Sequence, residues 1–457
     1  MDNARKALSN LAVSAVVSTP HVTGVLVRST IVAALGGLLF GFDTAVIAGT
    51  TKALSQVFSL TPQTLGLTVS SALWGTIIGA VLAGYAGDRW GRRDSLRIMA
   101  GLYLVSAIGC GLSWSWSSLL FFRILGGAGI GGSSVLGPIY IAEISPAPWR
   151  GRLVGVFQIN IVIGILTAYL SNYLIALAAF GTREWRWQFG IAALPSLTFL
   201  LLLFAIPRSP RWLIKKNRMT EAKHSLIAIG EPNVDRELAD IGLSLVLDEE
   251  KTGGRLFSRA HRLPIFLGIS VAVFSQLSGI NAVLYYLNDI FAVAGFTKIS
   301  SAVQAVVIGL TFLVFTLFAM ALIDKAGRRV LLLTGAIGMA STLTGIAAIV
   351  ANQSHKELLL WLLMVYIASF SFSLGAVTWV YISEVFPTAV RAKGQSLGSL
   401  SHWFTNAIIS GVFPTLEAKS VAAPFLFFAV MMVIQFFVVL TVYPETKNTS
   451  LERLNLA

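Results

Sequence analysis

Twelve apolar segments of about 20 residues follow one another along the chain. Each is long enough to cross the ~30 Å hydrocarbon core of a bilayer as a helix, and an open sheet edge could not satisfy its backbone groups there. Six segments lie on each side of a polar centre. The predicted segments are 28–50, 65–87, 95–114, 117–142, 153–178, 187–206, 263–292, 301–323, 329–351, 358–383, 395–417 and 421–443. The pattern predicts an all-α membrane protein with twelve transmembrane helices.

The polar centre mixes basic stretches with short segments of apolar periodicity, which predicts two or three amphipathic helices. We interpret it as a solvated, lipid-facing surface, with regulatory docking as the alternative. No clear cleavage site follows the first residues, so we expect a cytoplasmic tail and not a signal peptide. The predicted division is a tail (1–27), a six-helix bundle (28–206), the linker (207–262), a second bundle (263–443) and a C-terminal tail (444–457).

Composition supports a membrane protein and sets its orientation. Hydrophobic residues make up 55% of the chain and charged residues 12%, against about 25% charged residues in soluble domains. If both termini are cytoplasmic, all but seven of the 34 basic residues fall in cytoplasmic segments, as the positive-inside rule requires. This topology accounts for the net charge of +13, so we expect contact with the lipid bilayer and no nucleic acid.

Two charged motifs occur twice, once in each half. Asp-basic-x-Gly-Arg-Arg begins at Asp88 and again at Asp324, 236 positions later, and Glu-x6-Arg begins at Glu143 and at Glu384, 241 positions later. Duplicated halves in a hydrophobic chain indicate a transporter built from two pseudo-symmetric bundles. We expect the motif charges to gate the cytoplasmic side. They are Asp88, Arg92, Arg93, Glu143, Arg150, Asp324, Arg328, Arg329, Glu384 and Arg391.

The first predicted helix contains a carboxylate, Asp43, after a glycine-rich apolar stretch. A lone charge there costs roughly 2.5–3.5 kcal/mol on insertion scales. Its best partner is Arg123, which precedes a run of small residues that lets helices approach closely. The alternatives are an Asp43 that caps a helix end and an Arg123 whose side chain extends to the interface.

Neutral amides and tryptophans gather in several predicted helices, and they suit an uncharged, polyhydroxylated ligand. Gln276 and Asn281 flank a glycine at which the seventh helix is expected to unwind. The alternative reading is that the amides join helices and the tryptophans fill the core. The chain has no nucleotide loop, metal cluster or nucleophile triad in its sequence, and its one cysteine is Cys110. We therefore expect no cofactor and no enzymatic activity.

These motifs, with Pro207-Arg208-Ser209-Pro210-Arg211-Trp212 and Pro444-Glu445-Thr446-Lys447, closely resemble the sugar porter family of the major facilitator superfamily. The resemblance covers essentially the whole chain. It implies a twelve-helix fold with a cytoplasmic helical linker, and a sugar site between the bundles. The implied sugar-binding residues are Phe40, Gln158, Gln276, Asn281, Trp379, His402, Trp403 and Asn406, and the implied gating residues include Tyr285 and Tyr286.

The chain departs from the family pattern at several of these places. Ser275 stands where a second glutamine is usual, Phe312 and His402 stand where amides are common, and Ala376 replaces a proline. Arg208 replaces a glutamate in the linker motif. Since a buried hydroxyl left unpaired costs roughly 1–3 kcal/mol, these losses leave the sugar open between hexoses and pentoses.

Gly41-Phe42-Asp43, together with Arg123, follows the pattern of the symporters that the chain resembles; animal facilitators have an asparagine there. The predicted function is proton-coupled uptake of a monosaccharide by alternating access, by a monomer in the cell membrane. The alternatives are a passive sugar uniporter and a non-transporting sugar sensor.

Overall fold

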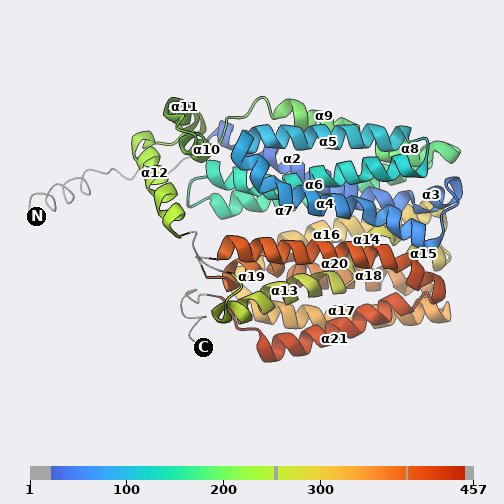
Figure 1. Cartoon of the computed structure of the whole chain (residues 1–457). Coiled ribbons are helices and arrows are strands. Elements are labelled where there is room, and N and C mark those ends of the chain that lie inside the picture. The colour runs from blue at the N-terminus through green and yellow to red at the C-terminus, as the bar shows by residue number, and fades with distance from the viewer. Residues whose placement is uncertain (1–21, 252–255, 388–389, 448–457) are drawn as a thin grey trace, which may run out of the picture.

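The computed structural model describes residues 22–251, 256–387 and 390–447, and the regular elements in these ranges are all helices. Consecutive long helices run in opposite directions, in two bundles that lie side by side (Figure 1). Helices α2 to α9 form the N-bundle, and helices α13 to α21 form the C-bundle. Three short helices, α10 to α12, lie together beyond one end of the bundles. We call this the linker end, and we call the opposite end, where α3, α8 and α15 lie, the far end.

The helices of the N-bundle are α2 (Gly24–Val46), α3 (Thr51–Val57), α4 (Pro62–Trp90), α5 (Arg92–Leu112), α6 (Trp116–Ile144), α7 (Arg150–Ala178), α8 (Glu184–Gly190) and α9 (Ala193–Leu202). The linker contains α10 (Pro210–Lys215), α11 (Met219–Ile229) and α12 (Val234–Lys251). The C-bundle contains α13 (Arg262–Leu277), α14 (Ile280–Tyr285), α15 (Leu287–Val293), α16 (Lys298–Ala326), α17 (Arg328–Asn352), α18 (Leu359–Phe370), the π-helix η5 (Ser371–Gly375), α19 (Ala376–Val385), α20 (Arg391–Lys419) and α21 (Ala423–Val442).

All twelve predicted segments coincide with helical structure, and the linker contains the predicted short helices. Among the described residues, ten helical stretches are long and apolar enough to cross a membrane. The other two predicted segments correspond to α20 and to the pair α8 and α9, which is divided around Ile191. Helix α20 has 29 residues but is less apolar, because polar side chains such as His402 and Asn406 are buried along it. The predicted tails lie mostly outside the described residues.

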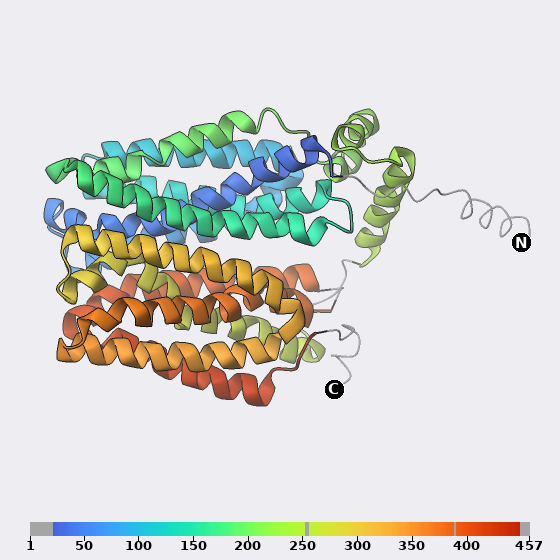
Figure 2. The same cartoon turned by 180° about the vertical axis from the view of Figure 1, so that it is seen from behind.

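The two bundles meet along two helix pairs. Helix α4 packs against α20, and α7 packs against α16; the second pair is seen from behind in Figure 2. Near the far end the backbones themselves come into contact, since a Cβ atom added at Gly66 of α4 would overlap the carbonyl oxygen of Gly411 in α20. Small residues allow this approach, as is common between membrane helices. The bundles are therefore tightly packed at the far end.

The repeated Asp-basic-x-Gly-Arg-Arg motif has the same backbone conformation in both halves. Gly91 has φ 89° and ψ 156°, and Gly327 has φ 87° and ψ 154°. This region of the backbone map is open essentially to glycine alone. Each glycine ends one helix and is the N-cap of the next, so the chain reverses between α4 and α5 and again between α16 and α17. The motif glycine is thus required by the turn that it makes.

The linker is attached to the N-bundle by several hydrogen bonds. The Trp212 indole donates to the Asp88 carbonyl at 3.1 Å, and Tyr140 Oη donates to the Pro207 carbonyl at 2.7 Å. Lys215 forms an ion pair with the Asp88 carboxylate at 3.0 Å. At the start of α2, Thr23 Oγ1 donates to the Ile229 carbonyl of α11 at 2.7 Å. These contacts place the linker helices across the end of the N-bundle.

We expect Gly91→Ala to destabilise the protein by about 1–3 kcal/mol, because alanine is strained in this backbone region. The added Cβ would also lie 3.0 Å from the Trp212 ring. The matched control is Gly101→Ala in α5, where no atom lies within 4 Å of the added Cβ. Thermal unfolding in detergent should show a lower midpoint for Gly91→Ala only. Equal midpoints for the two variants would contradict the role given to the turn.

Candidate functional site

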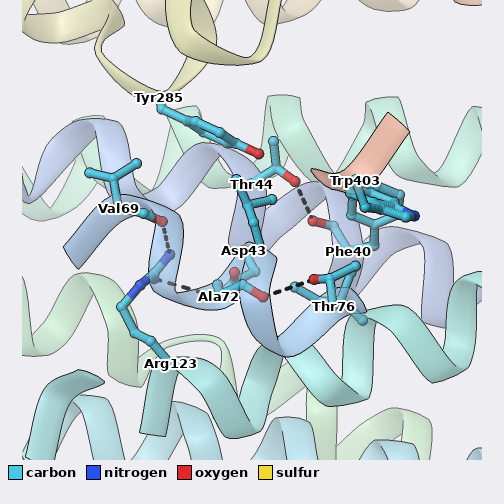
Figure 3. A pocket seen from close by; sticks show the side chains of 11 residues that line it. Phe40, Asp43, Thr44, Val69, Ala72, Thr76, Arg123, Tyr285 and Trp403 are labelled. Atoms are coloured by element: carbon cyan, nitrogen blue, oxygen red, sulfur yellow. Dashed lines mark hydrogen bonds and ion pairs between the residues drawn. The ribbon is translucent and has the colours of Figure 1, made fainter. Parts of the chain in front are cut away.

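A cavity lies between the bundles (Figure 3). Residues of α2, α4 and α6 line it from the N-bundle, and residues of α14 and α20 line it from the C-bundle. The lining residues are Phe40, Asp43, Thr44, Val69, Ala72, Leu73, Thr76, Arg123, Ile130, Tyr285 and Trp403. The cavity therefore brings together five of the residues that the sequence singled out, from both halves of the chain.

Asp43 and Arg123 face each other across this cavity. The distance from Arg123 Nη1 to Asp43 Oδ1 is 3.9 Å, and the Arg123 side chain is 3% exposed while that of Asp43 is 26% exposed. An ion pair at this separation has no direct hydrogen bond. The two charges attract each other, yet the carboxylate keeps access to the cavity.

Backbone carbonyls of α4 hold the Arg123 guanidinium in place. Nε donates to the Thr68 carbonyl at 3.2 Å, and Nη2 donates to the Val69 carbonyl at 3.5 Å. The group also lies over the Phe189 ring, 5.4 Å from its centre. Within the described residues, Nη1 has no hydrogen-bond partner. The nitrogen that faces Asp43 is thus the one that is left to interact with a carboxylate or a ligand.

Three polar side chains of the C-bundle form what we call the amide cluster: Gln276, Asn281 and His402. Asn281 Nδ2 donates to Gln276 Oε1 at 2.8 Å, and Gln276 Nε2 lies 2.9 Å from His402 Nε2. Gln276 is 2% exposed and His402 is 8% exposed. A second buried amide, Asn406, accepts a hydrogen bond from Ser410 and lies 3.5 Å from the Tyr285 hydroxyl. These groups can bond to the hydroxyls of a neutral ligand.

Aromatic rings connect the amide cluster to the central cavity. The His402 ring lies 4.8 Å from Trp379 and 5.2 Å from Trp403, measured between ring centres. Trp403 in turn lies 5.4 Å from Phe40 of the N-bundle. An aromatic surface beside amides can hold a sugar, because its C–H face packs on a ring while its hydroxyls are hydrogen-bonded. The cluster and the rings together form the candidate sugar site.

Two interruptions of helical structure lie beside this site. The seventh predicted helix breaks after Leu277, and Gly279 has φ 84° before α14 begins. This confirms the predicted unwinding at that glycine. The tenth contains the π-helix η5 directly before α19, which carries Trp379. Such π-turns are frequent at functional sites. The apolar pattern of 358–383 gave no sign of this turn.

In the described part of the chain, the predicted site residues Gln158 and Tyr286 neither line the central cavity nor form a hydrogen bond to the amide cluster. Gln158 is half-buried in α7 of the N-bundle, and none of the described hydrogen bonds joins it to the amide cluster. Tyr286 is 1% exposed; its hydroxyl donates to the Ser410 carbonyl, and its ring stacks on Phe413. It is therefore packed inside the C-bundle. Its neighbour Tyr285, by contrast, lines the central cavity.

The duplicated charged motifs form matching ion pairs at the linker end. Arg92 of α5 pairs with Glu143 of α6 at 3.0 Å, and Arg328 of α17 pairs with Glu384 of α19 at 2.9 Å. Each pair joins helices of one bundle. The side chain of Asp324 lies outside the described part of the chain. The other predicted gating residues make contacts within their own bundle. These are Asp88 with Arg92, Arg93 with Asp94 and the Ile206 carbonyl, Arg150 with the Ala142 carbonyl, Arg329 with the Leu440 carbonyl and Arg391 with the Phe386 carbonyl.

Each motif glutamate has a second partner that the sequence reasoning missed. Ser209 donates a hydrogen bond to Glu143, and Thr446 donates one to Glu384 at 2.6 Å. The two hydroxyl residues are themselves a repeat, since both stand two positions after a proline and lie 237 positions apart. A search of the sequence for further residues repeated about 236 to 241 positions apart would have found Ser209 and Thr446.

The two halves differ at the residue between that proline and that hydroxyl. In the C-bundle it is Glu445, whose carboxylate accepts hydrogen bonds from the backbone N–H groups of Arg328 and Arg329 at 3.0 Å each. Partial burial raises the pKa of Glu445, but these N–H donors and that of Lys447 outweigh it and lower the pKa overall. In the N-bundle it is Arg208, which pairs instead with Asp94 at 2.9 Å. The departure at Arg208 is thus matched by a carboxylate on α5.

Comparison with known proteins decides the family. The family model described as "Sugar (and other) transporter" matches residues 29–457. The chain belongs to the sugar porter family of the major facilitator superfamily. It is therefore an integral membrane protein that transports sugars, and it is not an enzyme. The predicted twelve-helix fold in two pseudo-symmetric bundles is confirmed.

Individual sugar porters match over nearly the whole chain. The D-xylose-proton symporter of Escherichia coli (strain K12) is 36% identical, covering 96% of each chain. The arabinose-proton symporter of Bacillus subtilis (strain 168) is also 36% identical, again covering 96% of each. The solved inward-open conformation of the xylose transporter from E. coli has a TM-score of 0.85 and 34% identity, and the match covers 94% of this chain and 99% of that one.

The structure gives a physical account of two departures from the family pattern. His402, where amides are common, still places a ring nitrogen 2.9 Å from Gln276, so a hydrogen-bonding group remains at this position. Phe312 is 7% exposed and packs edge-on against Phe370, with 6.2 Å between ring centres. It fills space next to η5 and offers no polar group. Compared with the family pattern, this sugar porter thus has no hydrogen-bonding side chain at Phe312, and at His402 it has an imidazole in place of an amide.

We expect Gln276→Ala to weaken sugar binding about ten- to a hundredfold, because it leaves a buried sugar hydroxyl unpaired at about 1–3 kcal/mol. It also removes the partner of Asn281 and His402. The control is Gln304→Ala in α16, a similar amide whose hydrogen bond is to Ser300. The sugar affinity of both variants is measured by equilibrium binding of labelled monosaccharides to purified protein. Unaltered affinity in correctly folded Gln276→Ala would refute the assignment.

Proposed function

We propose that this sugar porter is a proton-coupled monosaccharide symporter that works by alternating access. Sugar and proton cross together, because protonation of Asp43 controls the closure of the two bundles around the sugar. The observation that carries this proposal is the pair formed by Asp43 and Arg123. Its carboxylate borders the same cavity as Trp403 and Phe40, and its guanidinium is held by carbonyls of α4.

The geometry supports a carboxylate that can change its charge. Arg123 always remains protonated, so Asp43 is the member of the pair that exchanges a proton. At 3.9 Å the pair is close enough to attract and too long for a direct hydrogen bond. Loss of the Asp43 charge would leave Arg123 on its α4 carbonyls and without a carboxylate opposite Nη1. The free energy needed to protonate Asp43 is thereby limited, because Arg123 keeps its backbone partners.

In the proposed cycle, Asp43 takes up a proton while the cavity is open to the outside, and this weakens its attraction for Arg123. The bundles then close around the sugar, which is bound by the amide cluster, Asn406 and the aromatic rings. After opening to the inside, sugar leaves, the proton follows, and the charge pair forms again. The free energy of the proton gradient thus drives accumulation of sugar.

For the substrate we propose an aldopentose, with hexoses as the second class to test. The relatives whose names state a sugar and a proton are symporters of D-xylose and arabinose. Phe312 supplies no hydrogen bond where a family amide is common, so fewer sugar hydroxyls can be satisfied. A pentose, which has one fewer hydroxyl-bearing carbon than a hexose, fits a site with fewer polar partners.

We propose that the linker end and both termini face the cytoplasm, in the plasma or inner membrane, and that the transporter is monomeric. The basic residues support this orientation through the positive-inside rule. Arg208, Lys215 and Arg218, for example, all lie in the linker. The far end is then external. The sequence led us to expect the duplicated motifs to gate the cytoplasmic side, but their ion pairs each lie within one bundle. We therefore propose that these pairs brace each bundle at the cytoplasmic end while the bundles move.

Two other functions use the same residues differently. In a passive uniporter, Asp43 and Arg123 would be a structural pair only. In a sensor, the linker would transmit a signal without transport. The location of Asp43 in a cavity shared by both bundles favours symport over these readings, because a purely structural pair has no need to border the sugar site.

We expect Asp43→Asn to keep counterflow of labelled sugar but to lose accumulation driven by an imposed pH gradient, because asparagine imitates the permanently protonated carboxylate. Both activities are measured in proteoliposomes with a panel of labelled aldopentoses and hexoses. The control is Asp235→Asn in α12, the same change at an exposed position far from the cavity, which should accumulate sugar as the unmodified protein does.

Symport would be contradicted in either of two ways. The unmodified protein could fail to accumulate sugar under a pH gradient while performing counterflow, which would identify a uniporter. Alternatively, Asp43→Asn could accumulate as much sugar as the unmodified protein. Absence of counterflow for all the sugars, in protein that binds one of them, would identify the sensor.

A further inference from the structure

An ion pair joins the two bundles at the far end. Lys298 Nζ, at the start of α16 in the C-bundle, lies 2.6 Å from Glu184 Oε2, at the start of α8 in the N-bundle. The other carboxylate oxygen of Glu184 lies 3.4 Å from Gln188 Nε2. Unlike the ion pairs of the duplicated motifs, this one connects elements that belong to different halves of the chain.

The two members of the pair differ in their surroundings. The Glu184 side chain is 5% exposed and that of Lys298 is 66% exposed. Lys298 is the first residue of a 29-residue helix, where the positive end of the helix dipole disfavours a cation. The helix itself therefore gives no reason for a lysine here. The buried Glu184 carboxylate of the other bundle explains the lysine, because Lys298 is the one cation that contacts this carboxylate among the described residues.

The two bundles are in contact at the far end, whereas a residue of the sugar site nearer the linker end is exposed. Tyr169 Oη of the N-bundle donates to the Leu284 carbonyl of the C-bundle at 2.9 Å, and Gly66 of α4 closely approaches Gly411 of α20 at the same end of the bundles. Trp379, which packs on His402 and lies nearer the linker end, is 41% exposed. The match to a solved inward-open conformation agrees with this arrangement. The pair thus exists in a state that is closed at the far end.

We propose that Glu184 and Lys298 form an external latch, a charge pair that holds the far end closed and must break each time the transporter opens outward. When it breaks, Lys298 is already largely solvated, and water entering the opening can solvate Glu184. The latch therefore stabilises the inward-facing state without preventing the outward-facing one. This inference rests on alternating access, as proposed above, and does not depend on proton coupling.

A second pair of side chains at the far end provides the contrast that tests the latch. His355 Nδ1 and Glu357 Oε1 lie 3.5 Å apart between α17 and α18, within the C-bundle, and both side chains are more than 70% exposed; they form an ion pair only when His355 is protonated. Opening of the far end leaves both groups on the same bundle. Loss of this pair should therefore leave the balance between inward- and outward-facing states unchanged, although the chemical change and the side of the membrane are the same.

The experiment measures the separation of the bundles at the far end by pulsed electron resonance. Spin labels are placed at Gln63 and Ser354, which are exposed far-end positions in different bundles, in a Cys110→Ala background that removes the one native thiol. Glu184→Gln and Lys298→Gln should each raise the ratio of long to short distances about fivefold, as expected for a pair of roughly 1 kcal/mol. Glu357→Gln should leave the ratio unchanged.

A charge exchange separates the latch from a general loss of packing. The double variant Glu184→Lys with Lys298→Glu should return the ratio towards that of the unmodified protein, since the attraction is restored with the charges reversed. Lys298→Gln keeps the test valid if Glu184→Gln fails to fold, because the lysine is mostly exposed. An unchanged ratio in Lys298→Gln, or the same increase in Glu357→Gln, would overturn the latch. This readout needs no pH gradient, so a failure of symport leaves it interpretable.

Discussion

The interior of a bilayer offers no hydrogen-bond partner, so each polar group of this transporter must find one within the protein or in a cavity. Arg123 illustrates the consequence, since its burial would cost several kcal/mol without compensation. Two carbonyls of α4, the Phe189 ring and the Asp43 charge together compensate for it. The small residues of α6 permit this arrangement because they allow α4 to approach closely; a Cβ at Gly127 would overlap the Ala72 carbonyl. The close packing of α4 and α6 and the position of the Arg123 guanidinium are therefore one structural feature.

The duplication of the chain conserves geometry more than chemistry. Gly91 and Gly327 adopt the same backbone angles, and each is followed by an arginine that pairs with a glutamate of its own bundle. The halves differ in the carboxylate that lies at the start of the following helix. The C-bundle uses a carboxylate, Glu445, to cap the start of α17, whereas the N-bundle places a carboxylate in the first turn of α5 and pairs it with Arg208. Either way, negative charge lies at the N-terminus of the helix, where the dipole favours it.

The sequence was sufficient to predict what depends on hydrophobicity and on repetition. The twelve segments, the short linker helices and the break at Gly279 follow from local patterns, and the charge pair of Asp43 and Arg123 follows from the scarcity of charges within the apolar segments. The sequence did not reveal the π-helix η5 or the division of the sixth segment at Ile191, because neither changes the apolar pattern. It also did not reveal the pair of Glu184 and Lys298. These residues are 114 positions apart, at the starts of α8 and α16, and only the packing of the two bundles brings them together.

Ion pairs at the two ends of the molecule connect different parts of it. At the linker end, Arg92 with Glu143 and Arg328 with Glu384 connect helices of the same bundle, so they can persist while the bundles move apart. At the far end, Lys298 and Glu184 connect different bundles and cannot persist through an opening there. A bond within a rigid body does not affect an equilibrium between orientations of that body, whereas a bond between two bodies shifts it by its full free energy. On this reasoning we propose that the duplicated motifs keep each bundle rigid, and that the pair of Glu184 and Lys298 shifts the balance between the inward-facing and outward-facing states.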